Sequence, residues 1–160
     1  MKYILPATAL LLMFLFSGCN RQPEQFALTY TMESAENYKM SIEIDKDRRY
    51  LIRQQNIFFD KYAGIERINT SEGQMTDEEY DQLSELVSVS RLFKMKDAYG
   101  FKQESDPDNP FDGFIYQIIF TEGKKTKYIS IRDNPTNRFP DTFLQLLRFL
   151  SNYMSDHSSL

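Results

Sequence analysis

The sequence predicts an α+β domain, in which an antiparallel sheet of about five to six strands carries two helices packed on one face. Two observations lead to this prediction. Apolar and polar residues alternate with a period of two early in the chain, and the period becomes helical after Thr76. The predicted strands are clustered and do not alternate one by one with helices, which favours antiparallel pairing and the α+β class.

The first predicted strands cover residues 26–33 and 38–45, each with one apolar and one polar face, as in half-buried antiparallel strands. A turn leads from them into a third strand over residues 49–54. Residues 57–59 and 64–69 are expected to add one or two shorter strands. This order of strands indicates a meander.

Two helices are predicted from their start signals. Thr76 and Glu79 form a capping box, in which each side chain accepts from the other residue's backbone N–H. Pro140 can start the last helix, because the backbone N–H that proline lacks would have no hydrogen-bond partner within the first turn. Apolar residues follow at helical spacing in both segments. The last six residues, 155–160, are polar and predict a flexible tail.

Between the two helices, residues 100–113 form a polar loop whose two prolines exclude a regular element. Residues 114–121 form a strand that is apolar on both faces, as expected for a central strand of a covered sheet. A turn around Gly123 then leads into a strand over residues 125–132. The single domain is predicted to span residues 26–154.

The first 18 residues have the features of a secretory signal peptide. Lys2 provides a positive start, an apolar run of 14 residues covers 3–16, and two small residues follow. A membrane-spanning helix needs about 20 apolar residues, so this run is short for one.

Residues 15–19, Leu-Phe-Ser-Gly-Cys, resemble the lipobox of bacterial lipoproteins. The family's usual leucine three residues before the cysteine is Phe16 here, with Leu15 one place earlier. The resemblance implies a signal peptide over 1–18, acylation of Cys19, and a lipidated tether over 19–25. It also implies anchoring to a membrane of the bacterial cell envelope, on the periplasmic or outer-membrane face. The alternatives are an ordinary signal peptide and an uncleaved anchor.

A second resemblance covers residues 64–154. It consists of Leu83, Phe93 and Tyr99, followed by an aspartate-rich loop, a strand, a Gly-Lys hairpin and a helix started by proline. In this order the chain is similar to small lipoproteins of Bacteroidota that carry a domain of unknown function. The resemblance implies the fold class and the envelope location, and it implies no activity.

Composition excludes several function classes. The full chain has a net charge of −4, and without residues 1–18 the side-chain charge is (19 − 1) − 23 = −5. Nucleic-acid binding usually requires a basic surface, so nucleic acid is not an expected partner. Cys19 is the only cysteine, so an acylated chain has no disulfide and no thiolate metal site.

The acidic loop is a candidate calcium site. Asp106, Asp108 and Asp112 supply the oxygen ligands that the calcium ion prefers. The spacing departs from that of an EF-hand loop, because Pro110 and Phe111 stand where a ligand and a glycine would be expected. A solvated acidic loop is the alternative.

The aromatic run Phe58, Phe59 and Tyr62 is a candidate partner-binding patch, with packing beneath the helices as the alternative. His157 is the only histidine and falls in the expected tail, which cannot hold it for catalysis. We therefore expect a non-enzymatic protein without a cofactor or metal, acting as an interaction or structural module. The alternatives are an inhibitor of an envelope-directed hydrolase (a lysozyme or protease) that inserts loop 100–113, and a calcium or small-ligand binder.

Overall fold

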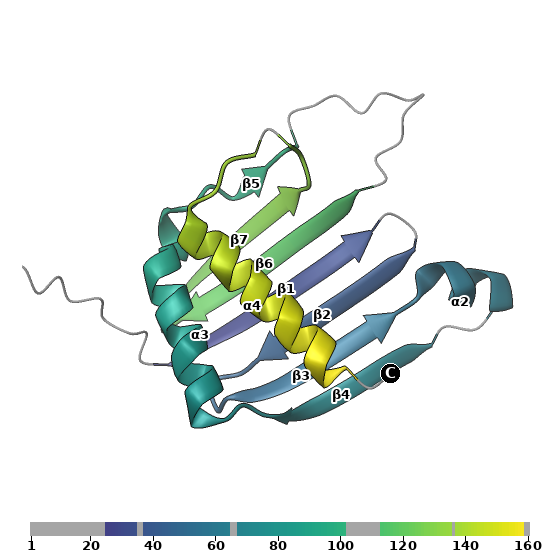
Figure 1. Ribbon diagram of the computed structural model, residues 1–160, viewed down its shortest axis with the longest axis horizontal. Helices are drawn as coiled ribbons and strands as arrows, with labels where there is room; N and C mark the ends of the chain where they lie inside the picture. The colour runs from purple at the N-terminus through teal and green to yellow at the C-terminus, as the bar shows by residue number, and fades with distance from the viewer. Residues whose placement is uncertain (1–24, 35–36, 65–66, 102–112, 136, 159–160) are drawn as a thin grey trace, which may run out of the picture.

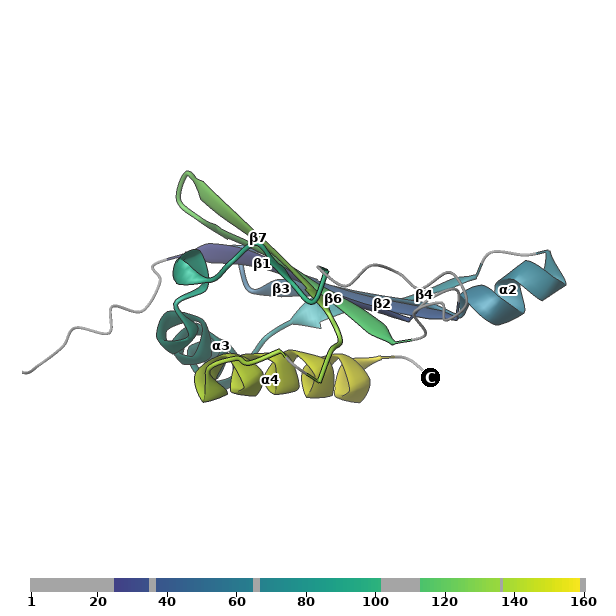
Figure 2. The same cartoon turned by 90° about the horizontal axis from the view of Figure 1, so that it is seen from above.

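The computed structural model describes residues 25–34, 37–64, 67–101, 113–135 and 137–158, without the side chains of Phe58 and Phe59. Its elements are β1 (Phe26–Ser34), β2 (Tyr38–Ile44), β3 (Arg49–Gln55), α2 (Ile57–Ala63), β4 (Ile68–Gln74), α3 (Asp77–Ser90), the 3₁₀ helix η2 (Leu92–Lys94), β5 (Ala98–Tyr99), β6 (Phe114–Glu122), β7 (Lys125–Arg132) and α4 (Asp141–His157). The strands form one sheet in the order β4-β3-β2-β1-β6-β7-β5. Helices α3 and α4 lie on one face of this sheet (Figures 1 and 2).

The α+β class is confirmed, but the predicted strand count, the purely antiparallel sheet and the helix count are wrong. The sheet has seven strands, and the two-residue strand β5 pairs parallel with β7, so the sheet is mixed. A strand this short has no periodicity that a sequence can reveal. A third helix, α2, lies beyond the ends of β3 and β4, away from α3 and α4 (Figure 1).

The expected short strands over 57–59 and 64–69 are the main errors in the meander. The first segment is helix α2, whose opening turn is closed by the amide of Asp60 donating to the carbonyl of Asn56 at 3.1 Å. Short apolar runs do not distinguish helix from strand, and here the helix formed. The second segment becomes a strand only from Ile68 and continues to Gln74. This edge strand is polar on both faces, so its alternation is weak.

Strand β1 lies in the middle of the sheet although it comes first in the sequence. It pairs antiparallel with β2 on one side and with β6 on the other, so that Leu28 is opposite both Ile44 and Phe120. Gly123 has a positive φ of 58° and makes the turn from β6 to β7 that the sequence predicted. Strand β1 is therefore the link between the two halves of the sheet.

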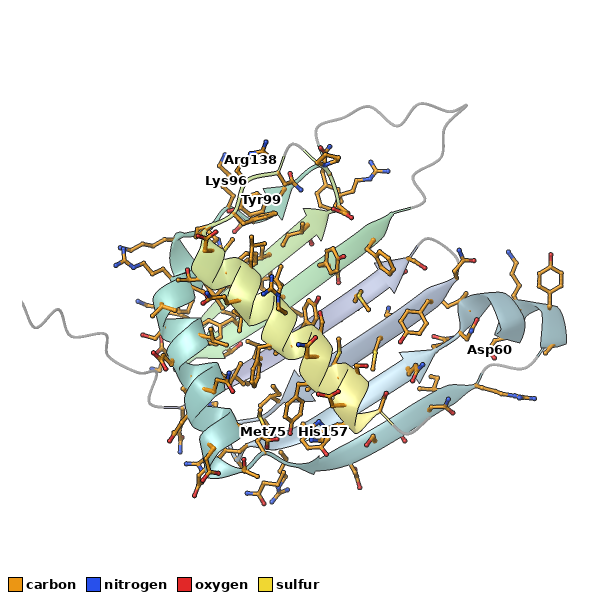
Figure 3. The ribbon with its side chains drawn as sticks, in the orientation of Figure 1. Asp60, Met75, Lys96, Tyr99, Arg138 and His157 are labelled. Atoms are coloured by element: carbon orange, nitrogen blue, oxygen red, sulfur yellow. The ribbon has the colours of Figure 1, made fainter. Side chains whose placement is uncertain are left out.

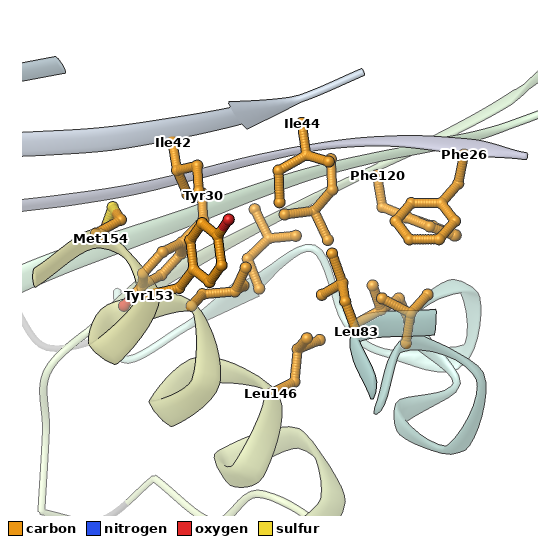
Figure 4. Packing of buried hydrophobic residues seen from close by; sticks show 14 of the residues in the cluster. Phe26, Tyr30, Ile42, Ile44, Leu83, Phe120, Leu146, Tyr153 and Met154 are labelled. Carbon is orange, nitrogen blue, oxygen red and sulfur yellow. The ribbon is translucent and has the colours of Figure 1, made fainter. Parts of the chain in front are cut away.

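The hydrophobic core lies between the sheet and the two helices (Figure 4). The ring of Phe26 stacks on the ring of Tyr80 from α3, with centroids 5.2 Å apart. Fully burying one such side chain contributes about 1.5–3 kcal/mol. The largest fully buried side chains include Phe26, Leu28, Tyr30, Ile42, Ile52, Leu83, Ile118, Phe143, Leu146 and Leu150. This layer holds α3 and α4 to the sheet.

The helix starts agree with the sequence prediction, but the end of the last helix does not. The capping box at Thr76 is present, and α4 begins directly after Pro140. However, α4 continues to His157, so residues 155–157 of the expected tail are helical. The ring of His157 stacks on the ring of Tyr153 one turn earlier, with centroids 4.0 Å apart, which stabilises this last turn. Among the described residues, none of the helices has the length and apolar character needed to cross a membrane.

Candidate functional site

Two of the predicted sites lie outside the described residues. Cys19 belongs to residues 1–24, and Asp106, Asp108 and Asp112 belong to residues 102–112. Lipidation of Cys19, calcium binding by the acidic loop and insertion of that loop into a hydrolase therefore stay predictions.

The third predicted site lies on α2. Phe58 and Phe59 are part of this helix, and their side chains are outside the described set. The side chain of Tyr62 is 77% exposed. Tyr62 therefore does not pack beneath α3 and α4, and its role in partner binding stays a prediction.

A groove of about 460 Å³ runs between α3 and α4 on the outer side of the helical layer. Most of the side chains that line it are polar or charged. They are Glu79, Gln82, Leu86, Gln145, Arg148, Phe149, Asn152, Tyr153, Asp156 and His157. This helix groove brings together titratable groups from both helices.

Within the helix groove, Glu79 is the centre of a small polar cluster. Its Oε2 accepts from the backbone amide of Thr76 at 2.7 Å and from the hydroxyl of Tyr153 at 3.5 Å. Its Oε1 lies 3.8 Å from Nε2 of His157. Burial, and then the negative charge of Glu79, raise the pKa of Tyr153 well above that of a free phenol.

The position of His157 corrects the sequence analysis, which assigned this residue to a flexible tail. Figure 3 shows His157 at the C-terminal end of α4, and its Nδ1 lies 3.0 Å from the carbonyl oxygen of Tyr153. The edge of its ring also meets Tyr50 of β3, at 5.5 Å between centroids. The spacing of four residues between Tyr153 and His157 was the signal that could have placed both rings on one helix face.

The chemistry of this cluster is that of a helix cap. Glu79 completes the capping box of α3, and each of its carboxylate oxygens already faces a group of the protein. Within the described part of the chain, no group of three or more His, Cys, Asp or Glu side chains could hold a metal ion. The cluster therefore links the start of α3 to the end of α4 through the contacts of Glu79 with Thr76, Tyr153 and His157.

The other face of the sheet is a second candidate surface, because α3 and α4 leave it uncovered (Figure 2). On this open face, Ile119 of β6 lies between Tyr128 of β7 and Thr29 of β1. The side chain of Tyr128 is 61% exposed and that of Ile119 is 36% exposed. We call Ile119 and Tyr128 the open-face pair.

Towards β2 and β3 the open face becomes charged. Lys39 and Glu33 form an ion pair at 3.3 Å, and Arg53 pairs with Glu43. The open-face pair is thus an apolar and aromatic spot beside a polar surface. The sequence analysis missed it, because a strand that is apolar on both faces does not reveal which of its faces the helices cover. In the structure α3 and α4 cover only the face that carries Ile118 and Phe120, and Ile119 points to the other face.

No model of a known protein family matches this chain, and no curated protein matches it significantly. The resemblances to lipoproteins accordingly stay predictions from the sequence.

Proposed function

We propose that this protein is a lipid-anchored protein of the bacterial cell envelope whose domain is a non-enzymatic module that binds another envelope protein through the open face of its sheet. The open-face pair is the observation that carries the binding part of the proposal. Tyrosine and large aliphatic side chains are costly to leave in water, and tyrosine is enriched among the residues that dominate protein interfaces.

The surroundings of the open-face pair support a protein partner. Glu43, which pairs with Arg53, lies opposite Thr29, the β1 neighbour of Ile119. The Glu33–Lys39 ion pair lies further along the same face. The apolar spot therefore has a polar border on the side of β2 and β3. Protein interfaces have this arrangement, with a water-excluding centre and a polar rim.

Site-specific crosslinking in intact cells tests the binding surface. A photoreactive phenylalanine analogue replaces Tyr128, and in a matched control it replaces Leu144. Leu144 is 42% exposed and belongs to α4 on the opposite layer. We expect one discrete crosslinked protein from position 128 and none from position 144. The same products from both positions, or none from position 128, would contradict the proposed surface.

The anchor is supported by the sequence of residues 15–19 and by the short apolar run before it. The test compares Cys19→Ala with the unchanged chain and measures how much of each protein is found in the detergent-extracted membrane fraction. We expect the variant to leave the membrane fraction, because acylation is then impossible. Retention of the variant in that fraction would show that Cys19 does not hold the anchor.

A further inference from the structure

We propose that the end of the domain at which β1 begins is a membrane-contact surface that binds the anionic headgroups of a phospholipid bilayer. This tether-end surface consists of Arg91, Phe93, Lys94, Lys124 and Lys125. The inference rests on the proposed lipid anchor at Cys19, and it adds an orientation of the domain and a lipid preference.

The first argument is distance from the anchor. Phe26 is the first residue of β1 and pairs with Glu122, the last residue of β6. The hairpin turn with Lys124 therefore lies beside the point where the chain enters the domain (Figure 2). From Cys19 to Phe26 there are 26 − 19 = 7 residue steps. At ~3.5 Å for each extended residue they span at most about 25 Å, so this end of the domain stays close to the bilayer.

The second argument is continuity of packing. The ring of Phe93 lies 5.3 Å from that of Phe120, and the ring of Phe120 lies 5.7 Å from that of Phe26. These three rings connect η2 to the first residue of β1. The cations of η2 and of the β6–β7 hairpin are thus on the same end of the sheet.

The third argument is charge. Arg91, Lys94, Lys124 and Lys125 are all exposed, whereas the whole chain has a net charge of −4. Glu122 lies among them, and Asp97 nearby is paired with Lys127. Among the described residues at this end, the four cations outnumber the carboxylate of Glu122, which leaves a positive surface on an acidic protein. Basic residues close to a bilayer are attracted by anionic lipids.

The fourth argument is an apolar groove beside two of these cations. A groove of about 230 Å³ has an apolar wall and a polar rim. The wall is made by Val87, Leu92, Phe93 and Phe120, and the rim by Ser88, Arg91, Lys94 and Glu122. The side chain of Phe93 in this wall is 39% exposed. An exposed aromatic ring with cations beside it fits the boundary of headgroups and acyl chains, where both kinds of side chain find their preferred surroundings. A free anion would use the cations and leave the ring in water.

The chain contains no tryptophan, so a single introduced tryptophan can report its depth in a bilayer. The test uses the full lipidated chain with Phe93→Trp, in phosphatidylcholine vesicles with or without phosphatidylglycerol, and with brominated acyl chains as quenchers. Tyr62→Trp is the matched control, because Tyr62 is an exposed aromatic residue of α2 at the opposite end of the sheet (Figure 2).

We expect several-fold stronger quenching for Phe93→Trp than for Tyr62→Trp, and an increase when phosphatidylglycerol is present. Adding Lys124→Glu and Lys125→Glu to the Phe93→Trp chain should remove that increase. Both lysines are exposed, so these changes leave the core intact.

Equal quenching at the two tryptophan positions would overturn the inference, as would quenching that does not respond to phosphatidylglycerol or to the two charge reversals. Loss of quenching on adding inorganic phosphate at matched ionic strength would also overturn it, since the cations would then bind a free anion. If the anchor itself fails, no variant sediments with vesicles, and the anchoring part of the proposed function falls together with this inference. If only the membrane-contact surface is wrong, the protein sediments and Phe93→Trp stays unquenched.

Discussion

The phenol oxygen of Tyr30 lies 3.0 Å from the hydroxyl oxygen of Ser151, which joins the middle of β1 to α4. Burial raises the pKa of Tyr30 from 10.0 to about 12, and the hydrogen bond to Ser151 only partly opposes this effect. The folded domain thus holds a neutral phenol at a position where a phenolate would be costly.

This relationship predicts a loss of stability in alkali. The contribution of neutral Tyr30 to the free energy of unfolding is fully present below pH 10, and it is lost as the pH rises through about 12. A rise in pKa of this size corresponds to about 3 kcal/mol of unfolding free energy, of which about half is lost by about pH 11. Urea unfolding at neutral pH and near pH 11 should therefore show a smaller decrease for Tyr30→Phe than for the unchanged chain. Tyr128→Phe removes an exposed phenol and is the control; an equal decrease in all three proteins would contradict the assignment.

The capping box gives a second prediction. The hydroxyl of Thr76 accepts from the amide of Glu79 at 3.2 Å, and this bond satisfies one N–H group of the first turn. Thr76→Ala should lower the free energy of unfolding by about 1 kcal/mol. Glu85→Ala, at an exposed position of α3, should change it by less than about 0.5 kcal/mol. Urea titrations of both variants measure the difference, and equal effects would argue against the cap.

Helix α4 offers a matched pair of leucines. Leu146 is fully buried between α4 and the sheet, whereas Leu144 of the same helix is 42% exposed. Leu146→Ala leaves a cavity and should cost about 2–5 kcal/mol. Leu144→Ala should stay within about 0.5 kcal/mol of the unchanged chain. Thermal unfolding of the two variants checks this, and similar midpoints would mean that α4 packs on the sheet with another face.

The surroundings of Gly100 and Gly123 predict different losses of unfolding free energy when each glycine is replaced by alanine. Both have positive φ angles, 77° and 58°, which cost a non-glycine residue about 1–2 kcal/mol. A Cβ atom on Gly100 would lie only 2.4 Å from the carbonyl oxygen of Arg132, while a Cβ atom on Gly123 meets nothing within 4 Å. Gly123→Ala should therefore cost about 1 kcal/mol and Gly100→Ala about 3 kcal/mol or more. Equal unfolding free energies for the two variants would show that the chain near Gly100 gives way to the added methyl group.

The features that the sequence predicted correctly depend on local signals. The capping box at Thr76, the proline start of α4 and the glycine turn at position 123 each act within a few residues. Alternation in residues 26–33 and 38–45 identified β1 and β2, because one face of each strand meets the core.

The features that the sequence did not predict depend on partners far along the chain. The pairing of β1 with β6 and the parallel contact of Ala98 with Ser130 join segments that share no local pattern. The exposure of Ile119 was not predicted for the same reason, since it depends on which face of the sheet α3 and α4 cover. The packing of His157 against Tyr50 also joins two distant elements, and only its spacing from Tyr153 could be read from the sequence.

The central position of β1 has a consequence for the order of folding. Phe26 is made early, yet its partner Glu122 follows 122 − 26 = 96 residues later. Closing so long a loop has an entropic cost that must be met before the contacts stabilise the sheet. The strands β1 to β4 can assemble only half of the sheet, with one side of β1 left without its backbone partner. During synthesis from the N-terminus, this side of β1 therefore stays open until β6 has been made. If residues 19–25 are the proposed tether, the tether is complete long before the domain that follows it can close.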